Sequence, residues 1–474
     1  MQDCRVLHLL DSAAMKRRVL AAVLPARSSL RELLQLALPV VVVQVGLMLM
    51  GVVDSIMVGR VSAAALAGVA LGNVYFFAFA IFGTGVVMAL DPVVSQAVGA
   101  GDEPAIARAV QRGLLLSALL TIPVSIPLCF AGPVLALLGQ PADAVPIAHE
   151  YTLRIVPSVF PFFAFVVFRQ TLQAMGRLAP IVWLTVLANL LNVWLDWSLV
   201  YGHFGMPALS ANGAAWATTI SRWAMMVGLV AVAWRDLHGH LRAVQPEVFR
   251  TAPLRRMIAI GAPIGVHMQL EFGVFGAVGL LMGRLGTDAV AAHQIALNLA
   301  SLTFMVPLGV SAAATVLVGR AVGQGQPESV RHAARAALFV GVGFMCCTAI
   351  LFIVVPSLFA MVYSRDVAVV ALAASLIPIA GVFQVFDGLQ AVSAGVLRGL
   401  ADTRYPMVIG LVGFWLVGLP ISLWLAFSMG LGPQGLWWGL VAGLVAVATL
   451  LLLRVRHRLG REMVRVVIDE GRRA

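Results

Sequence analysis

Four acidic residues stand inside long apolar runs of this 474-residue chain: Asp54, Asp196, Glu271 and Asp387. If those runs lie in a lipid bilayer, each charged side chain costs at least about 2.5–3.5 kcal/mol there. Such residues therefore usually face an interior cavity and mark the path of an ion or a substrate. The chemistry that such carboxyl groups offer is the reversible binding of protons, metal cations or organic cations.

Two of these acids have a polar residue four positions earlier, which places both side chains on one face of a helix. Asn192 precedes Asp196, and an amide and a carboxylate one turn apart can together hold a hard cation or a proton. His267 precedes Glu271. This histidine can relay protons or tune the acid, but the simpler interpretation is a hydrogen bond to a backbone carbonyl near a kink at Pro263.

Around the last acid, Gln384, Asp387 and Gln390 form a polar stripe at spacing three. A structural alternative applies to every one of the acids. Each could be permanently protonated, or paired with Arg169 or Arg222, the two arginines inside apolar runs. One isolated acid is easily explained in this way, whereas four together favour a functional role.

The composition places the chain in a membrane. Hydrophobic residues make up 61% and charged residues 11% of it, whereas soluble domains carry about 25% charged residues. A spanning helix needs about 20 mainly apolar residues. No long stretch alternates with period two, so we expect an all-α integral membrane protein rather than a β-barrel. Twelve segments qualify as spans: 31–58, 65–98, 110–138, 148–175, 180–202, 211–234, 254–283, 290–320, 334–362, 368–397, 406–429 and 433–453.

The sequence repeats itself at a constant shift of 224 residues, without a gap. Span 1 therefore corresponds to span 7, and because six spans are an even number, both halves have the same orientation. Two like-oriented halves related by an axis along the membrane normal are typical of secondary transporters. The matched pairs include Pro39 and Pro263, Gly59 and Gly283, Arg60 and Arg284, and Gly85 and Gly309.

The intramembrane acids do not follow this repeat. Asp54 corresponds to Val278, and Glu271 corresponds to Leu47. A purely structural device should tend to recur in both halves, so the asymmetry again favours a functional role.

The net charge of +11 is explained by topology. With the N-terminus inside, the inner segments carry 26 of the 32 lysine and arginine residues, as the positive-inside rule requires. This distribution argues against nucleic-acid binding. The single lysine, Lys16, excludes a phosphate-binding loop of the GxxxxGK[ST] type, and with it a self-contained ATP-driven pump of that kind. The remaining arginines are Arg169 and Arg222 within spans and Arg60, Arg154, Arg284 and Arg365 in outer loops.

Several motifs together resemble the multidrug and toxic compound extrusion (MATE) family, NorM-like branch. They are "VVDSIMVGR" in span 1, "VVSQAVGAGD" after span 2, "LLNVWLDWSLVYG" in span 5, "AAHQIALNLASL" in span 8 and "FDGLQAVSAGVLRGLADT" in span 10. The resemblance covers the chain from about Leu36 to about Leu453. It implies twelve helices in two pseudo-symmetric six-helix lobes, the MATE/MOP-type fold, and the efflux of lipophilic organic cations in exchange for H⁺ or Na⁺.

The resemblance also implies roles for the polar residues. Asp54 matches the essential acid of span 1, and Asn192 and Asp196 match its polar partners in span 5. Glu271 and Asp387 match acids associated with cation coupling, and are therefore a candidate Na⁺ site. An aspartate at position 196 resembles members discussed as proton-coupled, whereas Glu271 and Asp387 resemble members discussed as Na⁺-coupled. The coupling ion stays open between H⁺ and Na⁺, and no other cofactor is expected.

For the substrate we predict an apolar, adaptable site with a few polar groups. Flat aromatic cations can stack on phenylalanine rings, and methionine adapts to varied shapes, although packing and lipid contact explain such residues equally well. His267 is not part of the family pattern. The residues predicted to bind substrate are Gln44, Met50, Phe165, His267 and Gln384.

The predicted organisation has five parts: a basic cytoplasmic arm over 1–30, an N-lobe over 31–240, a cytoplasmic linker over 241–256, a C-lobe over 257–453 and a basic cytoplasmic tail over 454–474. Met15 is an alternative start to Met1. We expect a monomeric, multi-pass protein of the cell inner membrane, with both termini cytoplasmic, in contact with membrane lipid and small cationic drugs.

Two other functions fit the sequence less well. A flippase of lipid-linked precursors shares the two-lobe fold, but it would favour a cationic groove for pyrophosphate, and here the membrane interior holds more acids than arginines. An intramembrane aspartyl protease would need YD and GxGD motifs, which "VDS" and "FDG" do not match. We therefore do not expect an enzyme.

Overall fold

The computed structural model describes residues 25–241 and 244–469, and the predicted basic arm lies outside it except for its last residues. Within the described residues the chain is helical, with no strand. Twelve helices in this part of the chain are long and apolar enough to cross a membrane, which confirms the predicted fold class. The suggestion of a start at Met15 falls outside the described residues.

The first half of the chain forms the N-lobe. Two of its spans are each built from two consecutive helices, α3 with α4 and α7 with α8. The helices are α2 (Arg27–Gly59), α3 (Ala63–Val87), α4 (Leu90–Gly99), α5 (Glu103–Cys129), α6 (Ala131–Leu137), α7 (Ala144–Ile155), α8 (Val159–Ala174), α9 (Ala179–Tyr201), α10 (Ala211–Val232) and α11 (Trp234–Leu241).

The second half forms the C-lobe. The eleventh span of the chain, which belongs to this lobe, is irregular, because wider π-type turns over Leu411–Gly418 and Trp424–Ser428 flank the short α18. The helices are α12 (Thr251–Gly283), α13 (Thr287–Gly323), α14 (Pro327–Val354), α15 (Pro356–Tyr363), α16 (Val367–Gly399), α17 (Arg404–Gly410), α18 (Leu419–Leu423) and α19 (Gly432–Leu459).

Two predicted spans extend too far. The span predicted over 110–138 ends at Cys129, and the one predicted over 334–362 ends at Val354; each is followed by a separate short helix, α6 or α15. The cause is a proline in the overrun, Pro133 or Pro356, because proline lacks the backbone N–H and restricts the residue before it.

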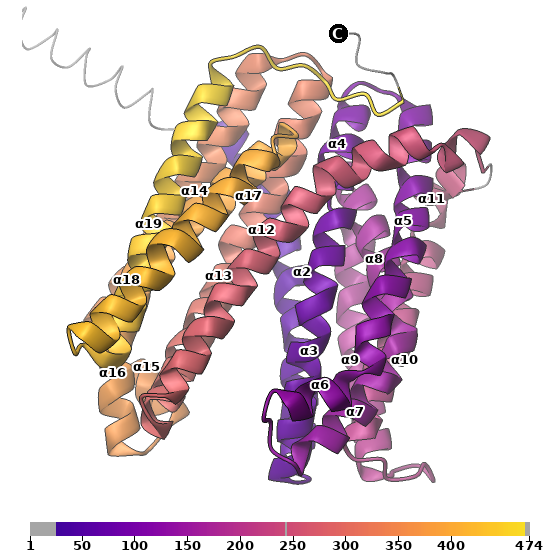
Figure 1. The fold of residues 1–474 in the computed structure, drawn as a ribbon. Helices are drawn as coiled ribbons and strands as arrows, with labels where there is room; N and C mark the ends of the chain where they lie inside the picture. The colour runs from indigo at the N-terminus through magenta and orange to yellow at the C-terminus, as the bar shows by residue number, and fades with distance from the viewer. Residues whose placement is uncertain (1–24, 242–243, 470–474) are drawn as a thin grey trace, which may run out of the picture.

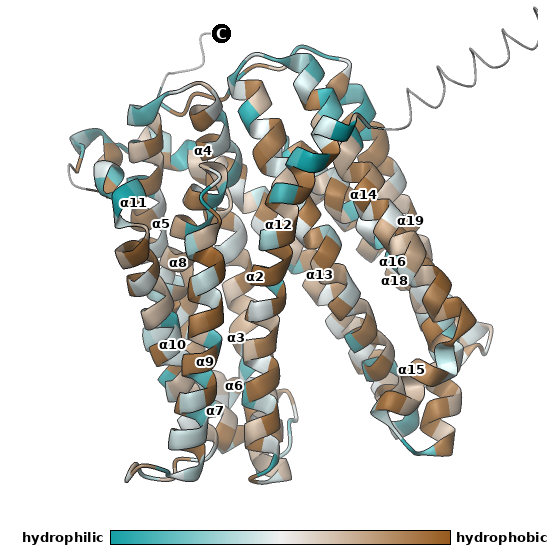
Figure 2. Ribbon diagram, turned by 180° about the vertical axis from the view of Figure 1, so that it is seen from behind, coloured by the Kyte–Doolittle hydropathy of each residue, from teal (hydrophilic) through white to brown (hydrophobic). Residues whose placement is uncertain are grey.

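The two lobes meet at one end of the molecule and diverge toward the other (Figure 1). The end where residues 25 and 469 lie is called the terminal end below. Helix α12 starts beside the N-lobe at the terminal end and reaches the C-lobe at the opposite end (Figure 1). Hydrophilic residues gather at the terminal end, whereas the long helices are mainly hydrophobic (Figure 2). This distribution fits a bilayer around the helices.

The internal repeat is visible in the packing between the lobes. A Cβ atom on Gly85 would lie 2.2 Å from the Cα of Gly265, so the two backbones touch. Gly309, which follows Gly85 by 224 positions, packs on Val41, which precedes Gly265 by 224; a Cβ atom on Gly309 would lie 2.5 Å from the Val41 side chain and 3.0 Å from its backbone nitrogen. The same contact is thus made twice, across a pseudo-twofold axis between the halves. This confirms two pseudo-symmetric lobes.

Candidate functional site

The first polar cluster lies inside the N-lobe, around Asp54 on α2. This side chain is only 3% exposed. The hydroxyl of Thr218, on α10, donates a hydrogen bond of 2.8 Å to Asp54 Oδ2. The other carboxyl oxygen, Oδ1, is buried without a hydrogen-bond partner among the described residues. Thr218 therefore holds Asp54 from one side, and the polar side chains of α9 approach the same carboxyl group.

Helix α9 brings Asn192 and Asp196 to the same place. Both side chains are fully buried and lie within electrostatic reach of the Asp54 carboxyl group. The side chains of Asn192 and Asp196 lie within hydrogen-bonding reach of the Asp54 carboxyl group. Two carboxyl groups that share a buried site repel one another when both are ionised, so a proton or another cation stabilises the pair.

Arg222, one turn after Thr218 on α10, is the nearest arginine to this cluster, and it does not form an ion pair with it. Its Nη1 donates a 2.8 Å hydrogen bond to the Ser158 hydroxyl. Its guanidinium group lies 4.3 Å from the ring centroid of Phe76 and 5.0 Å from that of Phe162. These contacts hold the positive charge beside the acids without neutralising either of them directly.

The second cluster lies in the C-lobe. Gln390, on α16, places its amide nitrogen 3.5 Å from Glu271 Oε2 and 3.5 Å from His267 Nε2, both on α12. Asp387, one turn before Gln390, is 7% exposed, and its nearest charged neighbour is Glu271. The two acids and the histidine thus face one another between α12 and α16. The spacing along α12 predicted that His267 lies beside Glu271, but not that Asp387 lies opposite them.

The structural alternative of acids locked onto arginines does not hold. None of the ion pairs found among the described residues involves Asp54, Asp196, Glu271 or Asp387. Arg169 instead donates a 2.9 Å hydrogen bond to Gln44.

The residues predicted to bind substrate are not joined to one another by any hydrogen bond found among the described residues. Gln384 is fully buried and already engaged, since it accepts a 2.7 Å hydrogen bond from Thr303 and donates one of 2.8 Å to Thr348. Met50 and Phe165 belong to the buried apolar core. Gln44 is bonded to Arg169, and His267 lies 3.5 Å from the Gln390 amide nitrogen.

The site residues therefore fall into two groups, one per lobe. Asp54, Asn192 and Asp196 come together, and so do Glu271 and Asp387, but the two groups belong to different bundles. The sequence did not single out Thr218, because a threonine in an apolar helix is unremarkable until the acid opposite it is known. Within the described residues, no group of three or more His, Cys, Asp or Glu side chains is arranged as a metal site.

Comparison with known proteins places this geometry in a family. A sequence model of the MatE family matches residues 39–198 and again residues 263–424. The chain belongs to the MatE family. The two matches begin 224 residues apart, the shift of the internal repeat, so each lobe is one copy of the family domain. MATE members are transporters rather than enzymes, as the sequence predicted.

Individual relatives agree with this assignment. The chain is 38% identical over 433 residues to the multidrug resistance protein NorM of Burkholderia vietnamiensis, covering 89% of this chain and 92% of the relative. It is 37% identical over 447 residues to the multidrug resistance protein PmpM of Pseudomonas aeruginosa, covering 90% and 91%. The fold is similar to the crystal structure of the eukaryotic MATE transporter AtDTX14, with a TM-score of 0.83 at 23% identity, covering 91% of this chain and 99% of that one.

Proposed function

We propose that this MATE transporter exports lipophilic organic cations in exchange for protons, and that the Asp54–Asp196 pair is the proton site. The observation that carries the proposal is a pair of neighbouring, buried carboxyl groups that have Asn192 and Thr218 beside them and form no ion pair with an arginine among the described residues. Relatives at 37–38% identity are named multidrug resistance proteins, which supports drugs as the exported cargo.

The physics of exchange follows from competition for negative charge. A protonated Asp54–Asp196 pair has little attraction for a cationic drug, whereas the deprotonated pair attracts it. Protons that enter from outside therefore weaken the hold on the drug and release it outward. One elementary charge crossing 100 mV supplies about 2.3 kcal/mol, which corresponds to roughly a fifty-fold concentration ratio.

Arg222 contributes a permanent positive charge to this scheme. Because it is held by Ser158 and two phenylalanine rings rather than by Asp54, it stays in place when the acids are protonated. It then repels an organic cation that the neutralised acids no longer attract, which favours release.

The second cluster, Glu271 and Asp387, is proposed as a further cation site in the C-lobe, with Gln390 and His267 as its polar partners. The two acids neighbour one another, so this pair also favours a bound cation, either a proton or Na⁺. Gln44, Met50, Phe165 and His267 are proposed to contact substrate as it passes; Gln384 is proposed for this role only if its two hydrogen bonds open.

The orientation is proposed from the charge distribution. The predicted inner segments carry most of the lysine and arginine residues of the sequence, and the terminal end is the more hydrophilic one (Figure 2), so we assign it to the cytoplasmic side. Twelve spanning helices and bacterial relatives fit a multi-pass inner membrane protein. The proposed domains are an N-lobe over 31–240 and a C-lobe over 257–453, joined by the linker over 241–256, and the lobes rock against one another within a single chain.

The experiment is transport in liposomes. Purified protein is reconstituted, a pH gradient or a Na⁺ gradient is imposed separately, and ethidium movement is followed. We expect a pH gradient to drive ethidium and the variant Asp54→Asn to abolish that movement. Movement driven by Na⁺ alone would reassign the coupling ion, and movement under neither gradient would refute antiport.

A further inference from the structure

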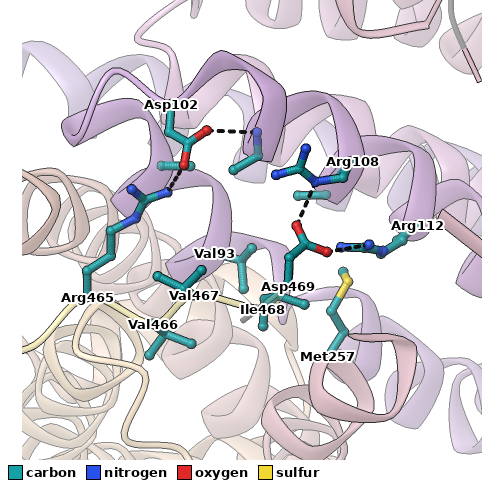
Figure 3. A pocket seen from close by; sticks show the side chains of 13 residues that line it. Val93, Asp102, Arg108, Arg112, Met257, Arg465, Val466, Val467, Ile468 and Asp469 are labelled. Atoms are coloured by element: carbon teal, nitrogen blue, oxygen red, sulfur yellow. Dashed lines mark hydrogen bonds and ion pairs between the residues drawn. The ribbon is translucent and has the colours of Figure 1, made fainter. Parts of the chain in front are cut away.

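The chain after α19 crosses from one lobe to the other at the terminal end. Residues 460–469, called the C-terminal strap here, leave α19 in the C-lobe and end against α5 of the N-lobe (Figures 1 and 3). The strap is irregular apart from short turns. It is nevertheless seated by several specific contacts.

The end of the strap is held by two arginines of α5. Asp469 Oδ1 lies 2.5 Å from Arg112 Nη2, and Asp469 Oδ2 lies 2.6 Å from Arg108 Nε (Figure 3). Arg112 is only 1% exposed, and Asp469 supplies the one carboxylate paired with it among the described residues. A buried charge that loses its oppositely charged partner is strongly destabilised, so the docked strap has a defined seat.

The electrostatics of this seat favour an ionised Asp469. Burial alone would raise the pKa of the Asp469 carboxyl group, but hydrogen bonds and positive charge from Arg112 and Arg108 outweigh that effect and lower the pKa below its ordinary value. The carboxylate therefore keeps its charge at neutral pH, and the ion pairs persist there.

The middle of the strap makes a second set of contacts. Arg465 forms an ion pair of 2.7 Å with Asp102, at the start of α5. The backbone N–H of Val466 donates a 2.8 Å hydrogen bond to the side-chain oxygen of Gln96, on α4. The amide nitrogen of that same Gln96 donates a 2.9 Å bond to the carbonyl of Gly399, on α16 of the C-lobe. Gln96 is fully buried and joins the strap to both lobes.

The strap also touches the segment that connects the lobes. Arg256, in the second turn of α12, donates a 2.7 Å hydrogen bond to the carbonyl of Ile468, whose side chain is buried. Arg112 donates a 2.9 Å bond to the carbonyl of Glu247 in the linker. The strap, the linker and α5 are therefore assembled around one buried arginine.

We propose that the C-terminal strap is a latch that stabilises the conformation closed at the terminal end and undocks when the lobes separate there. The strap is covalently attached to α19 and ion-paired to α5, so moving these helices apart strains or breaks its seat. The link to transport rests on the proposed function, because lobes that rock must separate at this end once in each cycle.

The latch is tested by measuring how far apart the two lobes are at the terminal end. Cysteines replace Gly239, on α11, and Arg335, on α14, in a protein whose native cysteines are replaced. Both positions are exposed, and a side chain at position 239 meets no atom within 4 Å. Spin labels there report the distance between N-lobe and C-lobe without touching the strap.

We expect one dominant short distance in the otherwise unchanged protein. Asp469→Asn should add a longer distance and raise the ratio of open to closed molecules on the order of tenfold, because a charge-assisted hydrogen bond is lost. Arg108→Gln, which removes only one of the two ion pairs of Asp469, should shift the ratio in the same direction but by less. Adding Arg108→Gln to Asp469→Asn should change little, because the pair with Arg108 is already lost.

The matched control is Glu462→Gln, which removes a carboxylate from the same strap. Glu462 is exposed and takes part in none of the ion pairs of the described residues, so the distance distribution should stay unchanged. If Asp469→Asn, Arg108→Gln and a deletion of residues 461–474 all leave the distances as they were, the strap is a passive tail and the latch is refuted.

This outcome is separate from the proposed function, because the distance measurement needs no transport. A population shift in the variants of a protein that fails to move ethidium would support the latch and refute proton-coupled export. Ethidium movement driven by a pH gradient, together with unchanged distances in the strap variants, would support proton-coupled export and refute the latch.

Discussion

Thr218 donates a 2.8 Å hydrogen bond to the buried carboxyl group of Asp54 from a neighbouring helix. The bond stabilises the ionised carboxylate. Thr218→Val keeps the shape and removes the donor, so the acid should become protonated more easily. We predict that the pH midpoint of ethidium export moves upward by up to about one unit. Thr218→Ser, which keeps a hydroxyl group, is the control; an unchanged midpoint in Thr218→Val would remove this bond from the mechanism.

Asp54 and Asp196 should act as one unit. Because the two carboxyl groups share a buried site, replacing either by asparagine should abolish export driven by a pH gradient. The double variant should be no worse than either single variant. Export rates in liposomes check this, with protein level and monodispersity as controls. Additive losses would mean that the two acids work independently.

In the C-lobe, Asp387→Asn should leave expression intact and impair coupled export, since it removes one acid of the Glu271–Asp387 pair. Transport under separate pH and Na⁺ gradients shows which coupling is lost. Export at the level of the unchanged protein would exclude Asp387 from the site.

The sequence predicted some elements of the fold well and others poorly. Hydropathy located twelve spans, and the matched glycines at positions 85 and 309 predicted the symmetry that their backbone contacts display. Helix ends were missed where Pro133 and Pro356 interrupt an apolar run, because hydropathy does not detect a missing backbone donor.

For the site, spacing along a helix predicted Asn192 beside Asp196, since both are on α9. It could not predict Thr218 beside Asp54, which depends on how α2 and α10 pack. Asp469 lies in a tail whose many arginines indicated only the topology of the chain. No neighbouring residue in the sequence identifies Arg112, 357 residues earlier, as the partner of Asp469.

The close packing between the lobes at the terminal end gives a stability prediction. A Cβ atom on Gly99 would lie 2.1 Å from the carbonyl oxygen of Arg320, a backbone atom that cannot move away easily. Gly99→Ala should therefore lower the free energy of unfolding by about 1–3 kcal/mol. The temperature at which half of the export activity is lost should fall by several degrees. Gly343→Ala, where a new Cβ meets nothing within 4 Å, is the control. Equal stability of the two variants would contradict the packing.

The strap should stay docked over the physiological pH range. The pKa of Asp102 is also lowered, because although burial opposes it, Arg465, the Ala105 N–H and Arg108 favour the charged form. A lowered pKa contributes stability above the ordinary aspartate value, which is lost only as pH falls through the folded-state pKa. Distances between labels at positions 239 and 335 should therefore be the same at pH 8 and pH 5. A longer distance at pH 5 would show that other groups release the strap.

The central claim is that protons and drug compete for the Asp54–Asp196 pair, and proton release measures this directly. Ethidium is added to purified protein in weakly buffered detergent solution, and the pH change is followed while binding is monitored by fluorescence. We predict that the unchanged protein releases protons as it binds ethidium and that Asp54→Asn binds with a smaller release. Saturable ethidium binding to the unchanged protein with no proton release would contradict the account.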